Sequence, residues 1–362
     1  MAGSPAATTV DWVADEAGFA ALAEPWDALL TPDSHPFDLH CWYAAWWKAF
    51  GGDRQLAVCV VRRGHQIVAV APLMRDSSGR ILAMANEQSS MFRLLAVDAD
   101  ARRALARALL ERRAPELFLS RIPADEPIIG DLCELGRSSG RLVASEPEHV
   151  SPIVDTSGDF DAWRADSKRR WGAPLERFRR KMQRDYDAEM TIVEPPVDLD
   201  GELAAGLRVE ASGWKGQAGT AILCDPATHA FYVEMSRAFH ERGALRLSRI
   251  VLDGRTAAFD LCLLDRGRLY LVKTAFDEDF RKLAPGLVLR LSTVERCFEL
   301  GLEAHELLGH RSEWKAKFAT RERPHVGVRA YPRRPLGVAR YAYRTSIRPP
   351  LRRAYRRVRA RG

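Results

Sequence analysis

The feature that most constrains the fold is a run of three successive strand-like segments in the second half of the chain. Leu245–Leu252, Thr256–Leu264 and Arg268–Thr274 are apolar and rich in residues that favour strands. The links between them, at 253–255 (DGR) and 265–267 (DRG), have the composition of hairpin turns. The pattern predicts a three-stranded antiparallel meander.

Helices and further strands surround this meander. Before it, we expect helices over Leu175–Tyr186, Leu199–Ser212 and Pro226–Arg242 and a strand at Met190–Val193. After it, we expect helices over Pro285–Leu300 and Ser312–Phe318 and strands at Ala304–Leu308 and His325–Ala330. Gly301 follows the first of these later helices at the position where glycine commonly ends a helix.

The first half of the chain predicts a second α/β unit of about 150 residues. Its expected helices are Leu39–Phe50, Ala101–Arg113 and Pro127–Ser139. Its expected strands are Leu56–Arg62, Gln66–Met74, Glu116–Ser120 and a weaker one around Arg141–Ser145. A polar stretch, Asp155–Asp161, then marks the junction between the two halves.

The chain has 362 residues, which is too long for one ordinary core and fits two domains. We predict an α/β (α+β) fold with an N-terminal domain at 1–155, a C-terminal domain at 156–333 and an arginine-rich tail at 334–362. Apolar stretches fall far short of the roughly 18 residues that span a bilayer, which argues against an integral membrane protein. The acidic N-terminus lacks the basic region of a secretory signal, and there is no fixed-period repeat.

Six cysteines are scattered singly, which favours a reducing, cytoplasmic setting. Nine histidines form no HExxH or HxH cluster, so we expect no metal site. The net charge of +7 is uneven. Residues 324–362 hold twelve arginines and no Asp, Glu or Lys, so +7 less twelve leaves −5 for residues 1–323. A second basic run covers Lys168–Arg184, and an anionic partner would be attracted to these two segments.

The segment Tyr270–Leu289 (YLVKTAFDEDFRKLAPGLVL) carries the clearest candidate site. A strand ends near Thr274, and a polar loop leads to a helix with Pro285 at its first position. Free amides at such a helix start, with Gly286 allowing close approach, favour an anion, and Arg281 can add a charge-assisted contact. The alternative is a plain strand-to-helix connection capped by Pro-Gly.

The spacing Arg281-x-x-Ala284-x-Gly286 is a degenerate form of the loop that holds the coenzyme A pyrophosphate in GNAT acyltransferases. Four segments in order strengthen the likeness: FDLHCWYAAWWKAFGG with VCVVRRGHQIVAVAPLM, EASGWKG at 210–216, KTAFD with APG at 273–286, and LLG with EWK at 307–315. The chain resembles the FemAB-like branch of the GNAT superfamily, which includes cellulose-biosynthesis and exopolysaccharide acetyltransferases. The resemblance implies two tandem GNAT-like domains with mixed, mostly antiparallel sheets flanked by helices, and it fades after Arg334.

Three departures from the family pattern stand out. Ala284 replaces a small polar residue, and the first glycine of the pyrophosphate loop is missing. Trp314 stands where many relatives have tyrosine, and an indole cannot act as a general acid.

The resemblance implies direct acyl transfer from acyl-CoA, most simply acetyl-CoA, without a metal. The strand Arg268–Thr274 should run beside the pantetheine arm. The implied cofactor-binding residues are Thr274, Arg281, Ala284, Pro285, Gly286 and Leu287. The candidate catalytic bases are Glu210, Asp260 and Asp277. The candidate substrate-binding residues are Trp214, Lys215, Lys273 and His310.

Each candidate also has an ordinary structural interpretation. Glu210 can be a solvated helix residue, and Trp214 a core residue. Asp260 lies in an apolar strand, where a buried acid needs a partner. Asp277 can cap a turn, Lys273 can be a solvated strand end, and a lone histidine such as His310 is usually structural.

The sequence predicts a cytoplasmic acyl-CoA-dependent N- or O-acyltransferase acting on an amino sugar or polysaccharide precursor. The first alternative is a FemAB-type aminoacyl-tRNA-dependent transferase, which the basic segment Lys168–Arg184 suggests. The second is a non-catalytic membrane-surface or assembly protein on a GNAT scaffold. The basic tail predicts weak binding to an anionic membrane surface at the inner face of the membrane, or else is disordered. Transfer RNA is a further possible partner.

Overall fold

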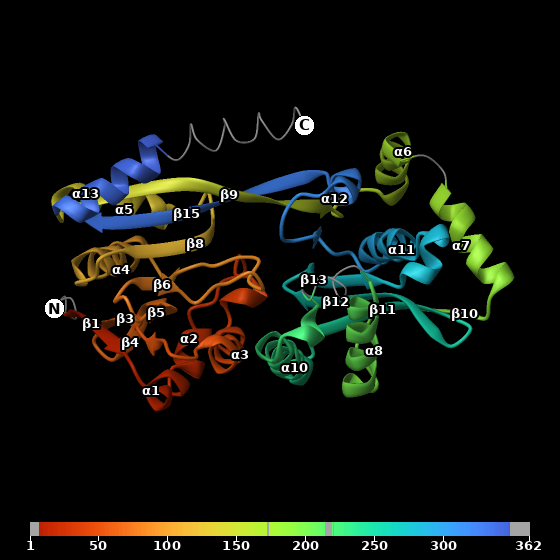
Figure 1. The fold of residues 1–362 in the computed structure, drawn as a ribbon, viewed down its shortest axis with the longest axis horizontal. Coiled ribbons are helices and arrows are strands. Elements are labelled where there is room, and N and C mark those ends of the chain that lie inside the picture. The colour runs from red at the N-terminus through yellow and green to blue at the C-terminus, as the bar shows by residue number, and fades with distance from the viewer. Residues whose placement is uncertain (1–6, 172–173, 214–218, 220, 348–362) are drawn as a thin grey trace, which may run out of the picture.

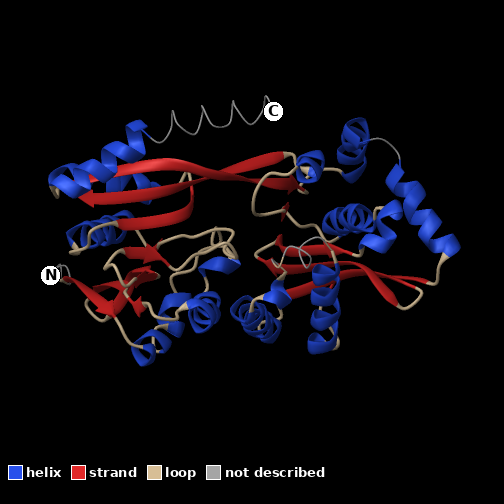
Figure 2. Cartoon of the chain, viewed as in Figure 1, coloured by secondary structure: helices blue, strands red, loops and turns tan. Residues whose placement is uncertain are grey.

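The computed structural model describes residues 7–171, 174–213, 219 and 221–347. Figure 1 shows two α/β halves side by side, joined along one edge by a long two-stranded ribbon. Helices flank the sheets of both halves (Figure 2). This arrangement confirms the predicted fold class. None of the helices in these ranges is long and apolar enough to span a bilayer.

The N-terminal half contains a small antiparallel sheet and the helices that cover it. The order of this sheet is β1 (Thr8–Val13), β3 (Val58–Arg63), β4 (Gln66–Ala71) and β7 (Leu95–Ala96). The helices of this half are α1 (Glu16–Ala20), α2 (Ala23–Asp27), η1 (Pro36–Asp38), α3 (His40–Phe50), α4 (Ala99–Glu111) and α5 (Pro127–Ser138). Local sequence sets these starts: Asp98 caps α4 by accepting the Ala101 amide at 2.8 Å, and Pro127 begins α5.

A second sheet of eleven strands runs through both halves of the molecule. Its order is β10 (Ala188–Glu194), β11 (Leu245–Leu252), β12 (Arg255–Asp265), β13 (Arg268–Phe276), β14 (Ala304–Glu306), β9 (Arg141–Asp155), β15 (Arg321–Pro332), β8 (Leu117–Pro123), β6 (Ile81–Ala83), β5 (Leu73–Arg75) and β2 (Gln55–Leu56). Only the pairs β13–β14 and β6–β8 are parallel. The ribbon of Figure 1 is the pair β9–β15, through which the last strand of the chain returns to the N-terminal half.

Three helices of the C-terminal half pack on the meander β11–β12–β13: α8 (Leu199–Ser212), α10 (Pro226–Glu241) and α11 (Pro285–Glu299). The other helices of this half, which pack on these three, on each other or on β9, are α6 (Phe160–Trp171), α7 (Pro174–Asp185), η2 (Ile222–Cys224), η3 (Glu278–Leu283) and α12 (Glu313–Phe318). Beyond β15, the chain adds α13 (Pro335–Ala342) and the turn η4 (Tyr343–Ile347). In Figure 1, α13 lies over the N-terminal half, beside the ribbon.

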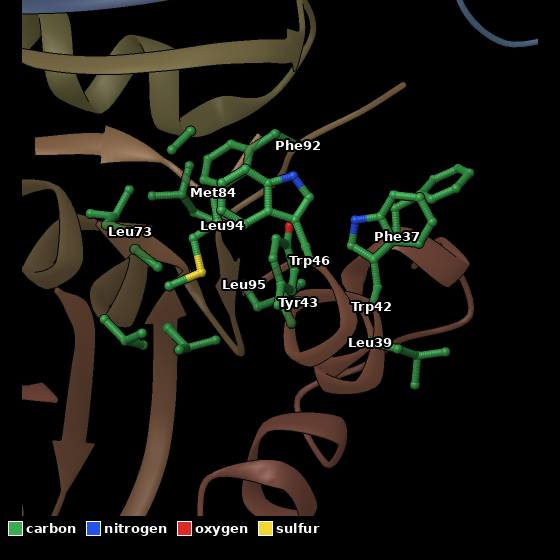
Figure 3. Close-up of a cluster of buried hydrophobic side chains, with 14 of the residues drawn as sticks. Phe37, Leu39, Trp42, Tyr43, Trp46, Leu73, Met84, Phe92, Leu94 and Leu95 are labelled. Atoms are coloured by element: carbon green, nitrogen blue, oxygen red, sulfur yellow. The ribbon is translucent and has the colours of Figure 1, made fainter. Parts of the chain in front are cut away.

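One apolar core joins the two halves. The aromatic helix α3 places Trp42, Tyr43 and Trp46 in this core, each about 1% exposed. Figure 3 shows them packed with Phe37, Phe92 and neighbouring aliphatic side chains; the two phenylalanines are also 1% exposed. Trp42 meets Phe231 of α10 edge to face, with ring centroids 5.1 Å apart. Because Phe231 belongs to the C-terminal half, the halves share one core.

The structure corrects four sequence expectations. The single strand expected at Gln66–Met74 is two strands, β4 and β5, which belong to different sheets. The strand expected around Arg141–Ser145 is the 15-residue strand β9, which reaches Asp155. The loop expected after Thr274 is a continuation of β13 to Phe276, followed by the 3₁₀ helix η3. The strand β1 and the helices α1, α2, α6 and α13 were not foreseen. The proposed domain boundary at 155/156 coincides with the end of β9 and stays a prediction.

Candidate active site

The strands β13 and β14 separate beyond a short paired stretch. They are joined only at Arg268–Ala304, Leu269–His305 and Tyr270–Glu306. β13 then continues to Phe276 along β12, whereas the chain beyond β14 turns away, with Leu308 and Gly309 at φ 52° and 57°. Backbone groups on the open edge of β13 are therefore available to an extended ligand.

A cavity of about 490 Å³ lies next to this opening, between β13, α8 and the start of α11. Its walls are mainly apolar, and the polar side chains come from a few positions. The lining residues are Val209, Glu210, Gly213, Thr274, Ala275, Phe276, Glu278, Arg281, Ala284, Gly286, Leu287 and Trp314. Six of the predicted site residues therefore meet here: Glu210, Thr274, Arg281, Ala284, Gly286 and Leu287.

The start of α11 forms one wall of the cavity. Ala284 precedes the helix in the left-handed conformation (φ 50°, ψ 49°), and Pro285 takes the first helical position. The amides of Leu287 and Val288 both donate to the Ala284 carbonyl, at 3.0 and 3.1 Å. The Gly286 amide makes no hydrogen bond to any residue of the described ranges. Fewer free amides than predicted are therefore present at the start of α11. Among the described residues, the Gly286 amide is the donor there that has no partner.

The wall at Gly286 has room for a small side chain. A methyl group added at this position would meet the ring of Phe276 at 3.5 Å, which is ordinary contact. Arg281 is 80% exposed and lies 3.9 Å from Glu278. Its guanidinium can therefore move toward an anion at the mouth of the cavity.

Glu210 is a buried carboxylate on the wall formed by α8. It is 3% exposed, and its Oε2 accepts the Ile222 amide at 2.8 Å. Its Oε1 lies 3.5 Å from Nζ of Lys273, whose ammonium also sits 5.3 Å from the ring centre of Tyr232. The Tyr232 hydroxyl donates to Gln88 of the N-terminal half at 3.1 Å. A polar chain therefore links the cavity to the other half of the molecule.

Asp260 lies behind the site rather than in the cavity wall. It is fully buried and pairs with Arg290 of α11 at 2.7 Å. Arg290 Nη1 approaches Nε2 of His305 at 2.7 Å, while Nδ1 of that ring lies 3.1 Å from the Leu269 carbonyl. Burial raises the pKa of Asp260, and burial together with Arg290 lowers the pKa of His305 well below its ordinary value. His305 is therefore neutral, with Nδ1–H donating to Leu269 and Nε2 accepting from Arg290.

The remaining predicted residues lie apart or outside the described ranges. Asp277 caps η3 by accepting the Asp279 amide at 3.0 Å and pairs with Arg255 at 2.8 Å. Pro285 is buried below the cavity wall. His310 is exposed and lines a different cavity, between the two halves. Trp214 and Lys215 belong to the segment 214–218, which the structure does not describe.

Trp314 is the main cavity residue to which sequence reasoning gave no site role. Its indole ring lies 5.7 Å from the Arg290 guanidinium and 5.6 Å from Nζ of Lys315. Lys315 Nζ donates to the Leu308 carbonyl at 2.6 Å and so holds the left-handed turn that opens the strands. The EWK segment was noticed as a family feature, and its spacing from LLG was the signal that could have placed Trp314 in the site.

Comparisons with known proteins agree with this geometry. Residues 167–316 match the family model described as Acetyltransferase (GNAT) domain. No curated protein matches the chain by sequence. The segment that matches includes β13, α11 and every residue that lines the 490 Å³ cavity.

Solved structures show the same fold across most of the chain. One is the DUF2156 C-terminal domain of a protein named as a lysylphosphatidylglycerol synthetase, from Agrobacterium fabrum, with a TM-score of 0.55 at 14% identity, covering 89% of this chain and 94% of that one. FemX has a TM-score of 0.55 at 12% identity and covers 84% and 95%. A conserved protein of unknown function from Bacteroides thetaiotaomicron has a TM-score of 0.53 at 12% identity and covers 88% and 99%. The match over residues 167–316 is thus to a GNAT acetyltransferase domain, and on that match the chain is an acyltransferase.

Proposed function

We propose that this acyltransferase uses acyl-CoA, most simply acetyl-CoA, and acts on an amino sugar or polysaccharide precursor, as members of the cellulose-biosynthesis-like branch do. The observation that carries the proposal is the opening between β13 and β14 beside a cavity that ends at the start of α11. An extended pantetheine arm fits the free edge of β13, because that edge offers backbone donors and acceptors. The Gly286 amide and Arg281 would hold the pyrophosphate.

Direct acyl transfer in this cavity requires one group that accepts a proton. It also requires that the attacking atom be held close to the thioester carbonyl carbon. The acceptor nitrogen or oxygen attacks the thioester carbonyl carbon and forms the new C–N or C–O bond. The C–S bond then breaks, and coenzyme A leaves as the thiolate or thiol. Glu278 also lines the cavity but is more exposed, so the buried Glu210 is the carboxylate that we propose takes the proton from the attacking group. The Ile222 amide and Lys273 fix its position, which lowers the cost of orienting it for transfer.

The first test is Gly286→Glu, with acetyl-CoA binding measured by calorimetric titration at low salt. The new carboxylate would face the pyrophosphate, so we expect binding to fall below detection while the circular dichroism spectrum is unchanged. Gly130→Glu is the matched control, because Gly130 is exposed on α5 and has open space around it. Equal affinity in the Gly286→Glu chain and the wild type would remove the donor site from this cavity.

The aminoacyl-tRNA alternative keeps the fold and changes the donor. The basic side chains of α7 are the reason for considering it. Some of their positive charge is already neutralised by ion pairs within the protein. Arg179 pairs with Glu176 and Glu295 at 2.8 and 2.9 Å, and Arg184 pairs with Asp185 at 2.6 Å. Acyl-CoA is therefore the better donor proposal. If nuclease treatment abolished activity and removal of acetyl-CoA did not, aminoacyl-tRNA would become the preferred donor.

We also propose that the protein is cytoplasmic and associates with the anionic inner face of a membrane through α13, η4 and the basic tail. Leu336, Tyr343 and Ile347 are 64%, 50% and 50% exposed and are followed by a segment rich in arginine. Apolar side chains beside clustered arginines suit an anionic lipid surface.

The test of this association is the triple variant Leu336→Gln, Tyr343→Gln and Ile347→Gln in the full chain. We expect its sedimentation with phosphatidylglycerol vesicles to fall severalfold, because each buried apolar side chain contributes to insertion. The control replaces the exposed Val97, Val197 and Leu300 in the same way. Identical vesicle binding by the two triple variants would dismiss the membrane role.

A further inference from the structure

A second cavity, of about 450 Å³, lies between the two halves of the molecule and has a polar wall. Segments far apart in the sequence meet there: the 85–87 loop, the strands β8, β9 and β15, the turn after β14, and η4. The polar side chains that matter for its chemistry are Arg121, Glu148, His149, His310 and Arg344.

One wall of this cavity is held rigidly. Arg121, within β8, has φ of 62°, a conformation that a non-glycine residue adopts only under constraint. Its amide donates to Oε2 of Glu148 at 2.6 Å, and its carbonyl lies 3.2 Å from Nδ1 of His325. Gly327 makes room for that carboxylate, because a methyl group there would come within 2.6 Å of Oε1 of Glu148. The surrounding strands therefore fix the direction of the Arg121 side chain.

Stacked imidazoles form the floor beside this wall. The rings of His149 and His325 are parallel within 7°, with centroids 4.3 Å apart, and His310 lies 5.0 Å from His149. Burial lowers the pKa of His149 to about 3 and that of His325 to about 4. Both rings are neutral near pH 7, so the positive charge of the cavity comes from its arginines.

Carboxylates (Glu87, Glu146 and Glu148) and arginines (Arg121, Arg329 and Arg344) both line this cavity, and some of the donors remain available to a ligand. Glu148 is occupied by the Arg121 amide. Among the described residues, the ion-pair partner of the Arg121 side chain is Glu87, which is 87% exposed, at 3.2 Å. Arg344 makes no hydrogen bond or ion pair within the described part of the chain, and His310 is engaged only through its ring. Donors without partners favour an anionic ligand.

Two structural links connect this cavity to the active site. His310 lines it, and Trp314, four residues later, lines the 490 Å³ cavity. Four residues span at most about 14 Å, which limits the distance between these two lining residues. The second link is the 85–90 loop, whose Gln88 accepts from Tyr232 beside Lys273.

We propose that the inter-domain cavity binds the anionic end of an elongated acceptor, whose amine or hydroxyl group reaches Glu210. The acceptor class is a saccharide that carries a phosphate or a carboxylate group at a distance from the acylated atom. This inference rests on the proposed function, because it names the acceptor for the same transfer. Arg121, Arg344 and His310 would contact the anionic group.

The test measures anion binding to the full chain by calorimetry with the donor cavity saturated by acetyl-CoA. Inorganic pyrophosphate is the phosphate probe, and glucuronate is the carboxylate probe. We expect one of them to bind at a single site, with affinity reduced about tenfold in Arg344→Ala and severalfold in His310→Ala, because each variant removes a donor. The matched control is Arg340→Ala, which removes the same charge from an exposed position on the adjoining helix α13.

The outcomes separate this inference from the proposed function. Absence of binding by both probes, or equal weakening in Arg340→Ala and Arg344→Ala, would overturn the acceptor cavity. Failure of acetyl-CoA to bind the wild type would instead overturn the donor proposal, and the anion titrations would then be repeated on the Gly286→Glu chain. Unchanged acetyl-CoA affinity in Arg344→Ala shows that the variant has left the donor cavity intact.

Discussion

Ala284 shows how a single residue shapes the donor cavity. Its left-handed conformation turns the chain from η3 into α11, whose first turn carries the cavity residue Gly286. This conformation crowds the Cβ atom of an L-residue against the backbone and is natural for glycine. The family loop has a glycine in this region that the present sequence lacks, so the fold retains the turn at an energetic cost.

Replacing this alanine should therefore stabilise the protein. We expect Ala284→Gly to raise the free energy of unfolding by about 0.5–1 kcal/mol, because the strain is relieved and exceeds the entropy cost of glycine. Urea unfolding at constant pH measures the change. Ala204→Gly, within the helix α8, is the control and should lower stability by about 1 kcal/mol. A loss of stability in both variants would mean that the turn is not strained.

Residue types were easier to predict from sequence than residue surroundings. An acid in an apolar strand requires a partner, and Asp260 has one in Arg290. The identity of that partner could not be predicted, because Arg290 is 30 positions away on another element. His310 was predicted to bind substrate, which stays a prediction; it lines the cavity between the two halves and not the 490 Å³ cavity. Its position depends on the left-handed turn at Leu308, which has no local sequence signal.

At the scale of elements, turn chemistry made the meander predictable. The glycine-containing links at 253–255 and 265–267 place β11, β12 and β13 within two residues of their expected ends. β9 was harder, since Pro147 and Pro152 argue against a central strand. The structure accommodates Pro147 beside a register shift in the β9–β15 pair, and β14 pairs only with Ile153–Asp155. The two prolines therefore remove few of the backbone hydrogen bonds between β9 and its neighbouring strands.

The whole molecule depends on pairings that no local pattern encodes. β15 is the last strand of the described residues, yet it pairs with β8 and β9 and so joins strands of the N-terminal half into the eleven-stranded sheet. Sequence periodicity could predict a strand there and not its partners, because strand order is set by the global packing of helices on both halves. The continuous sheet and the shared core suggest that the halves unfold together.

Thiol labelling can test this coupling, because fully buried cysteines lie in both halves: Cys59 in β3, and Cys262 in β12 with Cys297 in α11. Cys59 and Cys297 are the two thiols to be compared. Leu105→Ala, in the fully buried face of α4, should destabilise the N-terminal half by about 2–5 kcal/mol. If the halves unfold as one unit, the labelling rates of both thiols rise by the same factor. The control, Leu336→Ala, changes an exposed side chain and should leave both rates unaltered. Faster labelling of Cys59 alone would show that the N-terminal half opens independently, and the ribbon β9–β15 would then be a hinge rather than a bond between the halves.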